Sequence, residues 1–360
     1  MRKSGKKIGR SGYVSLFGFA LVLALLEVSA RLAAPGLPVD PGKWPRAEIA
    51  QKLDQIHGMI DDGQTADVIF VGSSMMAGGI DPVAFTDRSG VTSYNAAFAG
   101  PTTRTVGPWA VDILEPLLDP EVVVIGIHTR EMNDNAPKGQ TMYDKFITSP
   151  GYKQASASAA NRLEGELEDW SFFLRYRRAF RNPADLFSSD KAALAEAKVR
   201  KTIGPRGTRI EDSVEYRATD KFITTLYDKM LIDFAVGGVE YDALIDLHND
   251  LEDRGVRLVV VNMPVTEDYW PIHADPVGDM EAYHDLLERF QAETGDTIID
   301  AEDAFPTSVA FREPIHLDIE GRAAFGLALA DAWDDIMASE GERWHLACDG
   351  SEAPTCKLSR

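Results

Sequence analysis

A short apolar run that ends in a glycine and two serines constrains the fold of this chain more than any other stretch. Val68–Val71 consists of β-branched and aromatic residues, so it predicts a buried strand. Gly72, Ser73 and Ser74 follow, and a helix-compatible stretch comes next. Open α/β sheets bind ligands at the carboxyl ends of such strands, and a helix N-terminus offers free N–H groups to an oxyanion. The alternative interpretation is a plain strand-to-helix turn with Ser74 near the cap.

The same alternation continues along the chain. Further strands are predicted at 90–97, 122–128, 256–265 and 297–300. Helices are predicted at 46–59, 104–118, 241–254, 276–293 and 322–337. Repeated strand-helix units indicate a doubly wound α/β fold with a mainly parallel sheet. The segment 130–239 contains no clear strand and is predicted to be a helical insertion or cap. Its aromatic and basic stretch, 170–178, is interpreted as a helix packed on the body, the alternative being contact with an acidic ligand or lipid headgroups.

The charge of the chain bears on its partners. The 360 residues carry a net charge of −20, although five basic residues lie within the first ten. The rest of the chain is therefore more acidic than the total suggests. Such a surface repels the phosphate backbone, which argues against nucleic acid as a partner.

The N-terminal segment has the pattern of a membrane anchor. A basic segment, 1–12, precedes an apolar stretch, 13–34, which is long enough to cross a bilayer if Glu27 and Arg31 lie near its outer end. Those two residues are spaced to pair on a helix. We expect an uncleaved signal anchor, with the body outside the cytoplasm (periplasmic or at the cell surface); a cleaved signal peptide is the alternative. The Pro- and Gly-rich segment 35–45 is predicted to be a linker.

The two cysteines lie close together in a polar segment, 341–360, which we interpret as a C-terminal tail. Cys348 and Cys356 are eight positions apart, and in an exported chain this spacing predicts one local disulfide. A metal site would need more ligands, and only His345 lies nearby, so no metal site is expected there. The sequence implies no cofactor.

A serine nucleophile needs a base, a group that orients the base, and donors for the oxyanion. His316 precedes the last predicted helix, in what we expect to be a loop, and Glu313 lies three residues before it. One loop is therefore predicted to supply both the base and its carboxylate. Ser74, Glu313 and His316 form the predicted catalytic set. Another histidine, His273, is a weaker candidate for lining the site and is more simply interpreted as a packing residue.

This constellation resembles the SGNH (GDSL-like) hydrolase superfamily, especially its membrane-anchored bacterial branch related to cell-wall and exopolysaccharide acetylation. The resemblance covers roughly 66–337, without the insertion, and implies a flavodoxin-like sandwich. The first block is matched at 72–74, which implies that Ser74 is the nucleophile and that its N–H helps to hold the oxyanion. The second block is matched at 95–100, which implies that the Gly100 N–H is another oxyanion donor. The last block is matched by Glu313 and His316, with Gly321 following.

The chain departs from the family pattern at two places. Glu313 replaces the usual Asp, and its longer side chain still reaches an imidazole. The third block usually reads Gly-x-Asn-Asp, but here Gly126 is followed by Ile, His and Thr, so His128 takes the position of the oxyanion-binding Asn. Asn133 is a second candidate donor, and Ser73 is a further candidate site residue. A missing donor costs a few kcal/mol of transition-state stabilisation, which bears on turnover and not on the fold.

The expected function is an extracytoplasmic, membrane-anchored serine esterase or O-acyltransferase with a hydrolase domain over 46–340. By resemblance, its substrate class is O-acetylated carbohydrate of the cell envelope. The alternative, motivated by the altered third block, is a non-catalytic SGNH-fold module that binds glycan or protein. An α/β-hydrolase motif is incomplete because Met76 occupies its final glycine position, and a dinucleotide-binding glycine motif is absent after the first strand.

Overall fold

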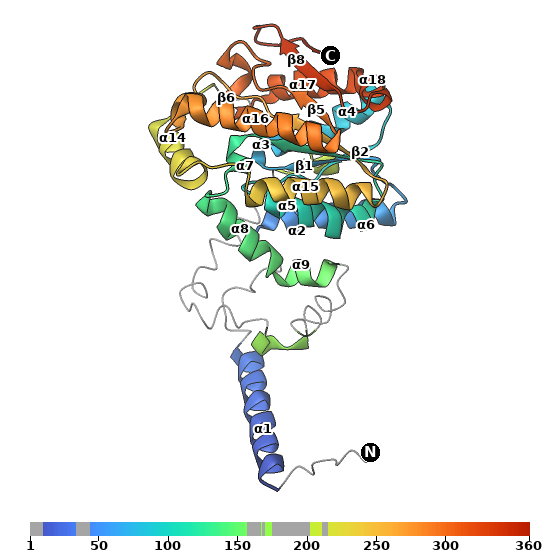
Figure 1. Cartoon of the computed structure of the whole chain (residues 1–360). Coiled ribbons are helices and arrows are strands. Elements are labelled where there is room, and N and C mark those ends of the chain that lie inside the picture. Colours follow the sequence, from blue (N-terminus) through green and yellow to red (C-terminus); the bar gives the residue numbers. More distant parts are fainter. Residues whose placement is uncertain (1–9, 34–43, 157–166, 168–169, 175–201, 211–214) are drawn as a thin grey trace, which may run out of the picture.

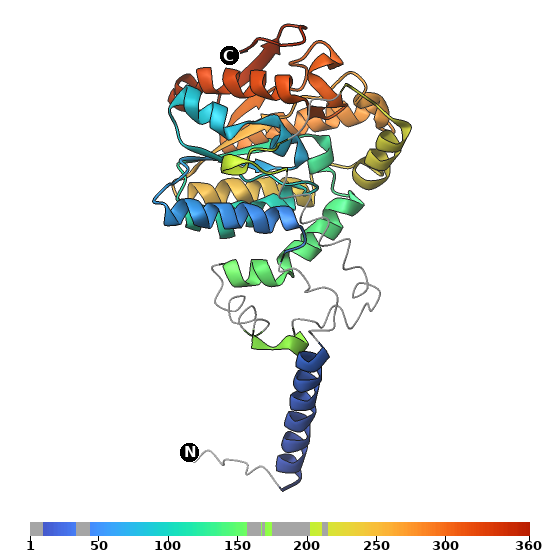
Figure 2. The ribbon, with the colours of Figure 1, turned by 180° about the vertical axis from the view of Figure 1, so that it is seen from behind.

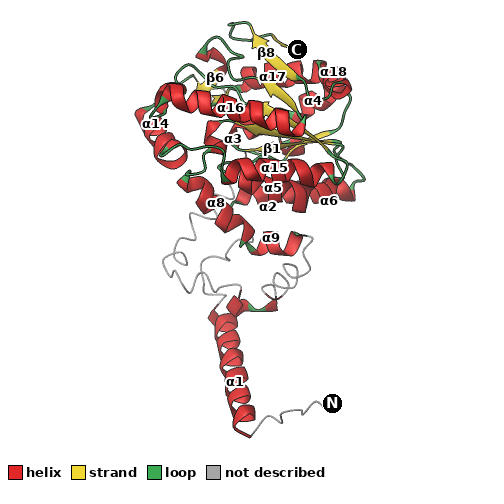
Figure 3. Cartoon of the chain, viewed as in Figure 1, coloured by secondary structure: helices red, strands yellow, loops and turns green. Residues whose placement is uncertain are grey.

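A parallel sheet forms the centre of the molecule. The computed structural model describes residues 10–33, 44–156, 167, 170–174, 202–210 and 215–360. Seven strands lie in the order β2-β1-β3-β4-β5-β8-β9, and each pairs in parallel with its neighbours except β9, which is antiparallel to β8. Figure 3 shows these strands in yellow between layers of helices. They span β1 (Val68–Gly72), β2 (Ser93–Asn95), β3 (Val122–Ile127), β4 (Arg257–Asn262), β5 (Thr297–Asp300), β8 (Arg343–Cys348) and β9 (Cys356–Ser359).

Helices cover both faces of the sheet. One apolar cluster packs α3, α4, α17 and α18 on one face, and a second packs α2, α5, α15 and α16 on the other. Figures 1 and 2 show the two layers from opposite sides. The helices of the body are α2 (Ala47–Asp61), α3 (Ser74–Gly79), α4 (Pro82–Ser89), α5 (Thr103–Trp109), α6 (Glu115–Leu118), α7 (Thr129–Met132), α8 (Pro137–Ile147), α9 (Pro150–Ala155), α14 (Asp220–Leu226), α15 (Val239–Glu252), α16 (Pro276–Thr294), α17 (Ile319–Asp331) and α18 (Trp333–Ala338), with short π-helical turns η2 (Ala110–Leu114) and η4 (Tyr227–Leu231).

The predicted doubly wound α/β fold is confirmed. Strands β1, β3, β4 and β5 are buried over nearly their whole length, as expected for a sheet covered on both faces. The predicted strand at 90–97 is shorter in the structure, where β2 spans Ser93–Asn95. The predicted final helix is two helices, α17 and α18, separated at Ala332.

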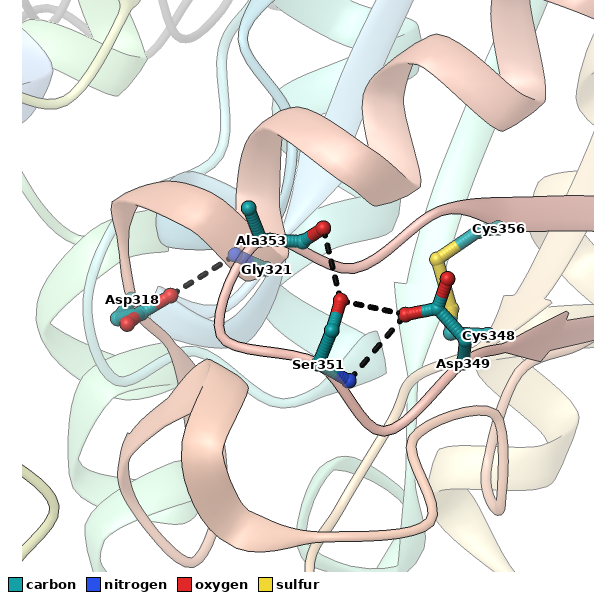
Figure 4. The surroundings of a disulfide bond; sticks show 7 residues. All are labelled: Asp318, Gly321, Cys348, Asp349, Ser351, Ala353 and Cys356. Carbon is teal, nitrogen blue, oxygen red and sulfur yellow. Dashed lines mark hydrogen bonds between the residues drawn. A yellow bond between two sulfur atoms is a disulfide. The ribbon is translucent and has the colours of Figure 1, made fainter.

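The C-terminal residues complete the sheet, which corrects their interpretation as a tail. β8 adds to the sheet beside β5, and β9 folds back on β8. The predicted disulfide between Cys348 and Cys356 is present and links these two strands. In the turn between them, Ser351 Oγ donates to Asp349 Oδ1 at 2.6 Å and to the Ala353 carbonyl oxygen at 2.9 Å (Figure 4). The hairpin is therefore held by a covalent bond and by a hydrogen-bonded turn.

The N-terminal helix α1 (Arg10–Ala33) extends away from the α/β body in Figures 1 and 2. Its predicted pair, Glu27 and Arg31, forms an ion pair at 2.6 Å. Glu27 also accepts hydrogen bonds from Ser171 Oγ at 2.7 Å and from the Phe172 N–H at 3.0 Å. In the part of the chain that the structure describes, no helix has both the length and the apolar character required to cross a membrane, so the predicted spanning segment at 13–34 is not supported.

The insertion and the linker lie partly outside the described residues. The predicted linker, 35–45, and the basic segment, 1–12, are mostly beyond them, as is the stretch 170–178 after Leu174. The described parts of 130–239 include helices α7, α8, α9 and α14 and a two-residue bridge between Ile203 and Arg209. The extent of the insertion as a unit stays a prediction.

Candidate active site

Ser74 lies at the carboxyl end of β1, where the chain turns into α3. Gly72 ends the strand with a φ of 139°, and a Cβ on it would lie 2.7 Å from the carbonyl oxygen of Gly126 on β3. Glycine fits here because it tolerates that φ and leaves room for the neighbouring strand. Ser73 caps α3, since its Oγ accepts a hydrogen bond from the Met75 N–H at 3.2 Å. Ser74 is therefore the first residue of α3, and it is 8% exposed.

The predicted base and its carboxylate lie on a small hairpin and not in a loop. The hairpin consists of β6 (Phe311–Glu313) and β7 (His316–Leu317), and its register places Glu313 opposite His316. His316 Nδ1 is hydrogen-bonded to Glu313 Oε1, and His316 Nε2 lies 2.8 Å from Ser74 Oγ. When Nδ1 donates its proton to the carboxylate, Nε2 is left to accept the proton of the Ser74 hydroxyl. The structure thus brings these three predicted residues into one hydrogen-bonded chain.

The protonation states of His316 and Glu313 suit a general base and the carboxylate that orients it. Burial lowers the pKa of His316 below 6.5, Glu313 opposes that change, and the positive charges of Arg130 and Arg209 lower the pKa further. For Glu313, burial raises the pKa, but the hydrogen bond and charge of His316 and the charge of Arg312 outweigh it, so its pKa lies below the ordinary value. At neutral pH the imidazole is therefore neutral and the carboxylate is ionised.

Gly100 ends the segment that follows β2 along the carboxyl end of β1. The segment after β2 runs along β1, because the Ala96 N–H donates to the Phe70 carbonyl at 2.8 Å and the Phe98 N–H donates to the Gly72 carbonyl at 3.2 Å. Two residues later the chain turns at Gly100, whose φ is 95°. Within the described ranges, the Gly100 N–H has no hydrogen-bond acceptor in the protein. This geometry agrees with an oxyanion-binding N–H group at Gly100, a role that stays a prediction.

His128 is turned away from the nucleophile, so the structure does not support its predicted role as an oxyanion donor. It is fully buried after β3, and its Nδ1 lies 3.2 Å from Thr129 Oγ1. Its Nε2 faces Glu302 Oε2 at 3.6 Å, and Tyr269 packs edge-on against the ring. The chain turns into α7 directly after Ile127, which directs this side chain into the interior between β3 and β4.

Asn133 is fully engaged in a structural role. Its side-chain amide donates to the carbonyl oxygens of Met230 and Ile232, and its side-chain oxygen accepts from the N–H groups of Asn135 and Ala235. The side chain is completely buried. Asn133 therefore fastens the end of α7 to the segment after η4 and has no donor left for an oxyanion.

His273 belongs to a buried network and not to an open site. Its Nδ1 lies 2.9 Å from Asp279 Oδ2, and its Nε2 lies 3.1 Å from Thr129 Oγ1. Thr129 is fully buried and also contacts the Tyr269 hydroxyl. Among the residues that the structure describes, no group of three His, Cys, Asp or Glu side chains is arranged to hold a metal ion.

Two cations near the predicted site have no counterpart in the sequence analysis. Arg130, in α7, is 3% exposed, and its Nε lies 2.6 Å from Glu131 Oε1. Lys138, in α8, extends over Gly100, so that its Nζ lies 3.2 Å from the position that a Cβ on Gly100 would take. No local motif marks either residue. The one available signal is a pair of cations shortly after a central strand in a strongly acidic chain.

Comparisons with known proteins assign no family to this chain. No protein-family model matches the chain, and no curated protein shows significant similarity to it. A crystal structure from Bacteroides fragilis NCTC 9343, described as a "putative acylhydrolase", is similar to the chain with 10% sequence identity and a TM-score of 0.36. The match covers 80% of this chain and 95% of the other.

Proposed function

We propose that this chain is a serine hydrolase of the SGNH type that acts on ester bonds, as an esterase or an O-acyltransferase. One observation carries the proposal: Ser74 Oγ lies 2.8 Å from Nε2 of His316, whose Nδ1 is hydrogen-bonded to Glu313. This is the nucleophile, base and orienting carboxylate that acyl transfer requires. The order of the matched blocks along the chain supports the SGNH assignment.

The chemistry follows from these positions. Ser74 Oγ attacks the ester carbonyl carbon while its proton passes to His316 Nε2, and the carbonyl electron pair moves onto oxygen. The oxyanion collapses, the bond to the leaving alcohol breaks, and the alcohol takes the proton from His316. Water or an acceptor hydroxyl then releases the acyl group from Ser74 by the reverse sequence. Glu313 holds the imidazole in position and stabilises the imidazolium throughout.

The proposed substrate class is O-acetylated carbohydrate of the cell envelope, and the proposed location is outside the cytoplasm. The substrate is supported only by the resemblance to envelope acetylation proteins. The disulfide between Cys348 and Cys356 supports the location, because such bonds persist in oxidising compartments. A glycan- or protein-binding module without turnover is the second candidate, favoured by the engagement of His128 and Asn133 elsewhere.

Covalent labelling tests the nucleophile directly. We expect a fluorophosphonate probe to form one adduct on the full-length chain, located by peptide mass spectrometry at Ser74. Ser74→Ala should abolish the adduct. Ser73→Ala is the matched control: it should keep the adduct while losing about 1 kcal/mol of stability with the helix cap. An unlabelled parent protein, or an adduct that persists in Ser74→Ala, would contradict the proposal.

The pH dependence tests the base. His316 acts only when neutral, so activity falls as the pH drops through its pKa, which burial places below the ordinary 6.5. We expect the acid limb of kcat/KM for p-nitrophenyl acetate to have its midpoint below pH 6.5, the ordinary value for a histidine. Glu313→Gln removes the carboxylate that raises the pKa of His316, so the fall should move to lower pH. An acid limb above about pH 7 would be inconsistent with the assignment.

A further inference from the structure

The altered third block leaves the proposed site short of one oxyanion donor, and two cations, Arg130 and Lys138, lie in α7 and α8, which follow that block. The candidates suggested by sequence, His128 and Asn133, are both engaged in the interior. The remaining predicted donors are the N–H groups of Ser74 and Gly100. What lies against Gly100 therefore decides how charge on the substrate oxygen is stabilised.

Lys138 occupies that position. Its Cε lies 2.8 Å, and its Nζ 3.2 Å, from the place of a Cβ on Gly100, so the ammonium group lies directly over this glycine. Any side chain at position 100 would collide with it. Within the described ranges the ammonium has neither a hydrogen-bond nor an ion-pair partner, although it is half-buried. A partly desolvated, unpaired cation is costly, which indicates that it is kept for an anion absent from the free protein.

Arg130 adds positive charge that acts on both Lys138 and His316. Burial is the main cause of the lowered pKa of both Lys138 and His316, and the charge of Arg130 lowers each further, so Arg130 lies within electrostatic reach of both. The neighbouring carboxylate, Glu131, has contacts of its own. Its Oε1 faces Arg130, and its Oε2 accepts a hydrogen bond from the His128 N–H at 3.1 Å. Glu131 favours the charged form of Lys138, but both of its carboxylate oxygens are directed toward other groups.

We infer that the Lys138 ammonium, backed by the Arg130 guanidinium, is the third donor of the oxyanion hole, beside the N–H groups of Ser74 and Gly100. The inference rests on the proposed function. When Ser74 attacks, the electron pair of the carbonyl moves onto oxygen, and the Lys138 ammonium stabilises that charge without giving up its proton. The catalytic proton still passes only between Ser74 Oγ and His316 Nε2.

Charged groups on each neighbouring element determine how Lys138 titrates. Three cations disfavour the ammonium: Arg46 just before α2, Arg130 in α7 and Lys229 in η4. Glu131 favours it.

Other charged groups nearby have partners of their own. Glu48 of α2 lies 3.9 Å from Arg46 and accepts the Ala99 N–H. On α5, Arg104 is directed toward Tyr143 and Glu240. Burial and the surrounding cations lower the pKa of Lys138 to about 8.

Lys138→Met tests the inference with p-nitrophenyl acetate, a neutral ester. We expect kcat to fall about 100-fold, the usual cost of one oxyanion donor, with little change in KM. Lys145→Met is the matched control. Lys145 is an exposed residue on the same helix, so this variant also loses one positive charge, but kcat should stay unchanged. Circular dichroism and thermal melting establish that each variant is folded.

The alkaline limb provides a second readout. An ammonium is lost as the pH rises through its pKa, so the parent enzyme should lose activity above about pH 8, after correction for spontaneous hydrolysis. Lys138→Arg should retain part of the activity and extend it to higher pH, because arginine does not titrate there. Lys138→Met should show low activity without this limb.

The outcomes separate this inference from the proposed function. If Ser74→Ala is inactive but Lys138→Met equals Lys145→Met, the inference is overturned and the serine assignment stands. If Lys138→Met weakens only KM for an anionic ester, Lys138 binds substrate charge and the oxyanion role is likewise overturned. A parent protein that neither hydrolyses p-nitrophenyl acetate nor reacts with a fluorophosphonate would overturn both.

Discussion

Ser74→Ala is expected to reduce kcat for p-nitrophenyl acetate at least about 10⁴-fold, because no other group can form the acyl-enzyme intermediate. His316→Ala should cost about as much, since a serine hydroxyl without a base within 2.8 Å is a poor nucleophile. Residues that act as one unit give non-additive losses, so the double variant should be no slower than either single variant. Steady-state kinetics on the full-length chain, with thermal melting as the folding control, measures all three.

These kinetics also discriminate between the two candidate functions. A binding module predicts no turnover in the parent protein and the same ligand affinity in Ser74→Ala. Turnover that survives in both single variants would place the reaction elsewhere on the molecule. Losses that multiply in the double variant would mean that Ser74 and His316 act separately, against the hydrogen bond that joins them.

Gly72→Ala is expected to destabilise the fold by about 3 kcal/mol or more. The residue has a φ of 139°, and the added Cβ would lie 2.7 Å from a backbone oxygen of β3 and 3.2 Å from Met76 Cβ. A backbone atom in the central sheet cannot move aside as a flexible side chain can. Urea denaturation of the variant should show a lower midpoint with a similar slope.

Gly58→Ala is the matched control for this change. Gly58 lies within α2, and no atom lies within 4 Å of an added Cβ there. The same methyl group should therefore stabilise the helix by about 0.5 to 1 kcal/mol. If the two variants had equal stability, the turn after β1 would be less constrained than its geometry indicates.

The sequence predicted the body of the fold because most of its strands are continuous apolar runs. β3 reads Val-Val-Val-Ile-Gly-Ile, and such a run leaves little choice but a strand buried on both faces. β8 and β9 were missed because they lie in a short polar segment that was interpreted as a tail, where neither strand is a continuous apolar run. The hairpin β6–β7 was missed because two or three residues carry no detectable period.

The structure brings together the predicted Ser74, Glu313 and His316, whereas the positions of the other predicted site residues depend on packing. Ser74 follows from a glycine-serine turn after a strand, and Glu313 with His316 follows from a three-residue spacing. His128 was an expectation based on position alone, but the start of α7 turns its ring toward Glu302. Lys138 could not be found from sequence, because its relation to Gly100 arises only when α8 packs over the segment after β2.

Because His316 and Glu313 lie on one small hairpin, the site depends on the distance between His316 Nε2 and Ser74 Oγ. The two residues move together, because they face each other across the same two strands. The hairpin is tied to the body by the Thr266 N–H on the Pro314 carbonyl at 2.9 Å and by the Arg217 N–H on the Arg312 carbonyl at 2.8 Å. A shift of the β6–β7 hairpin away from α3 would break the hydrogen bond between Ser74 and His316, so the serine would lose its base. The hydrogen bond between His316 and Glu313 would stay intact. The backbone donors of Arg217 and Thr266, which are not part of the proposed triad, thus help to set the distance between His316 Nε2 and Ser74 Oγ, and with it the reaction rate.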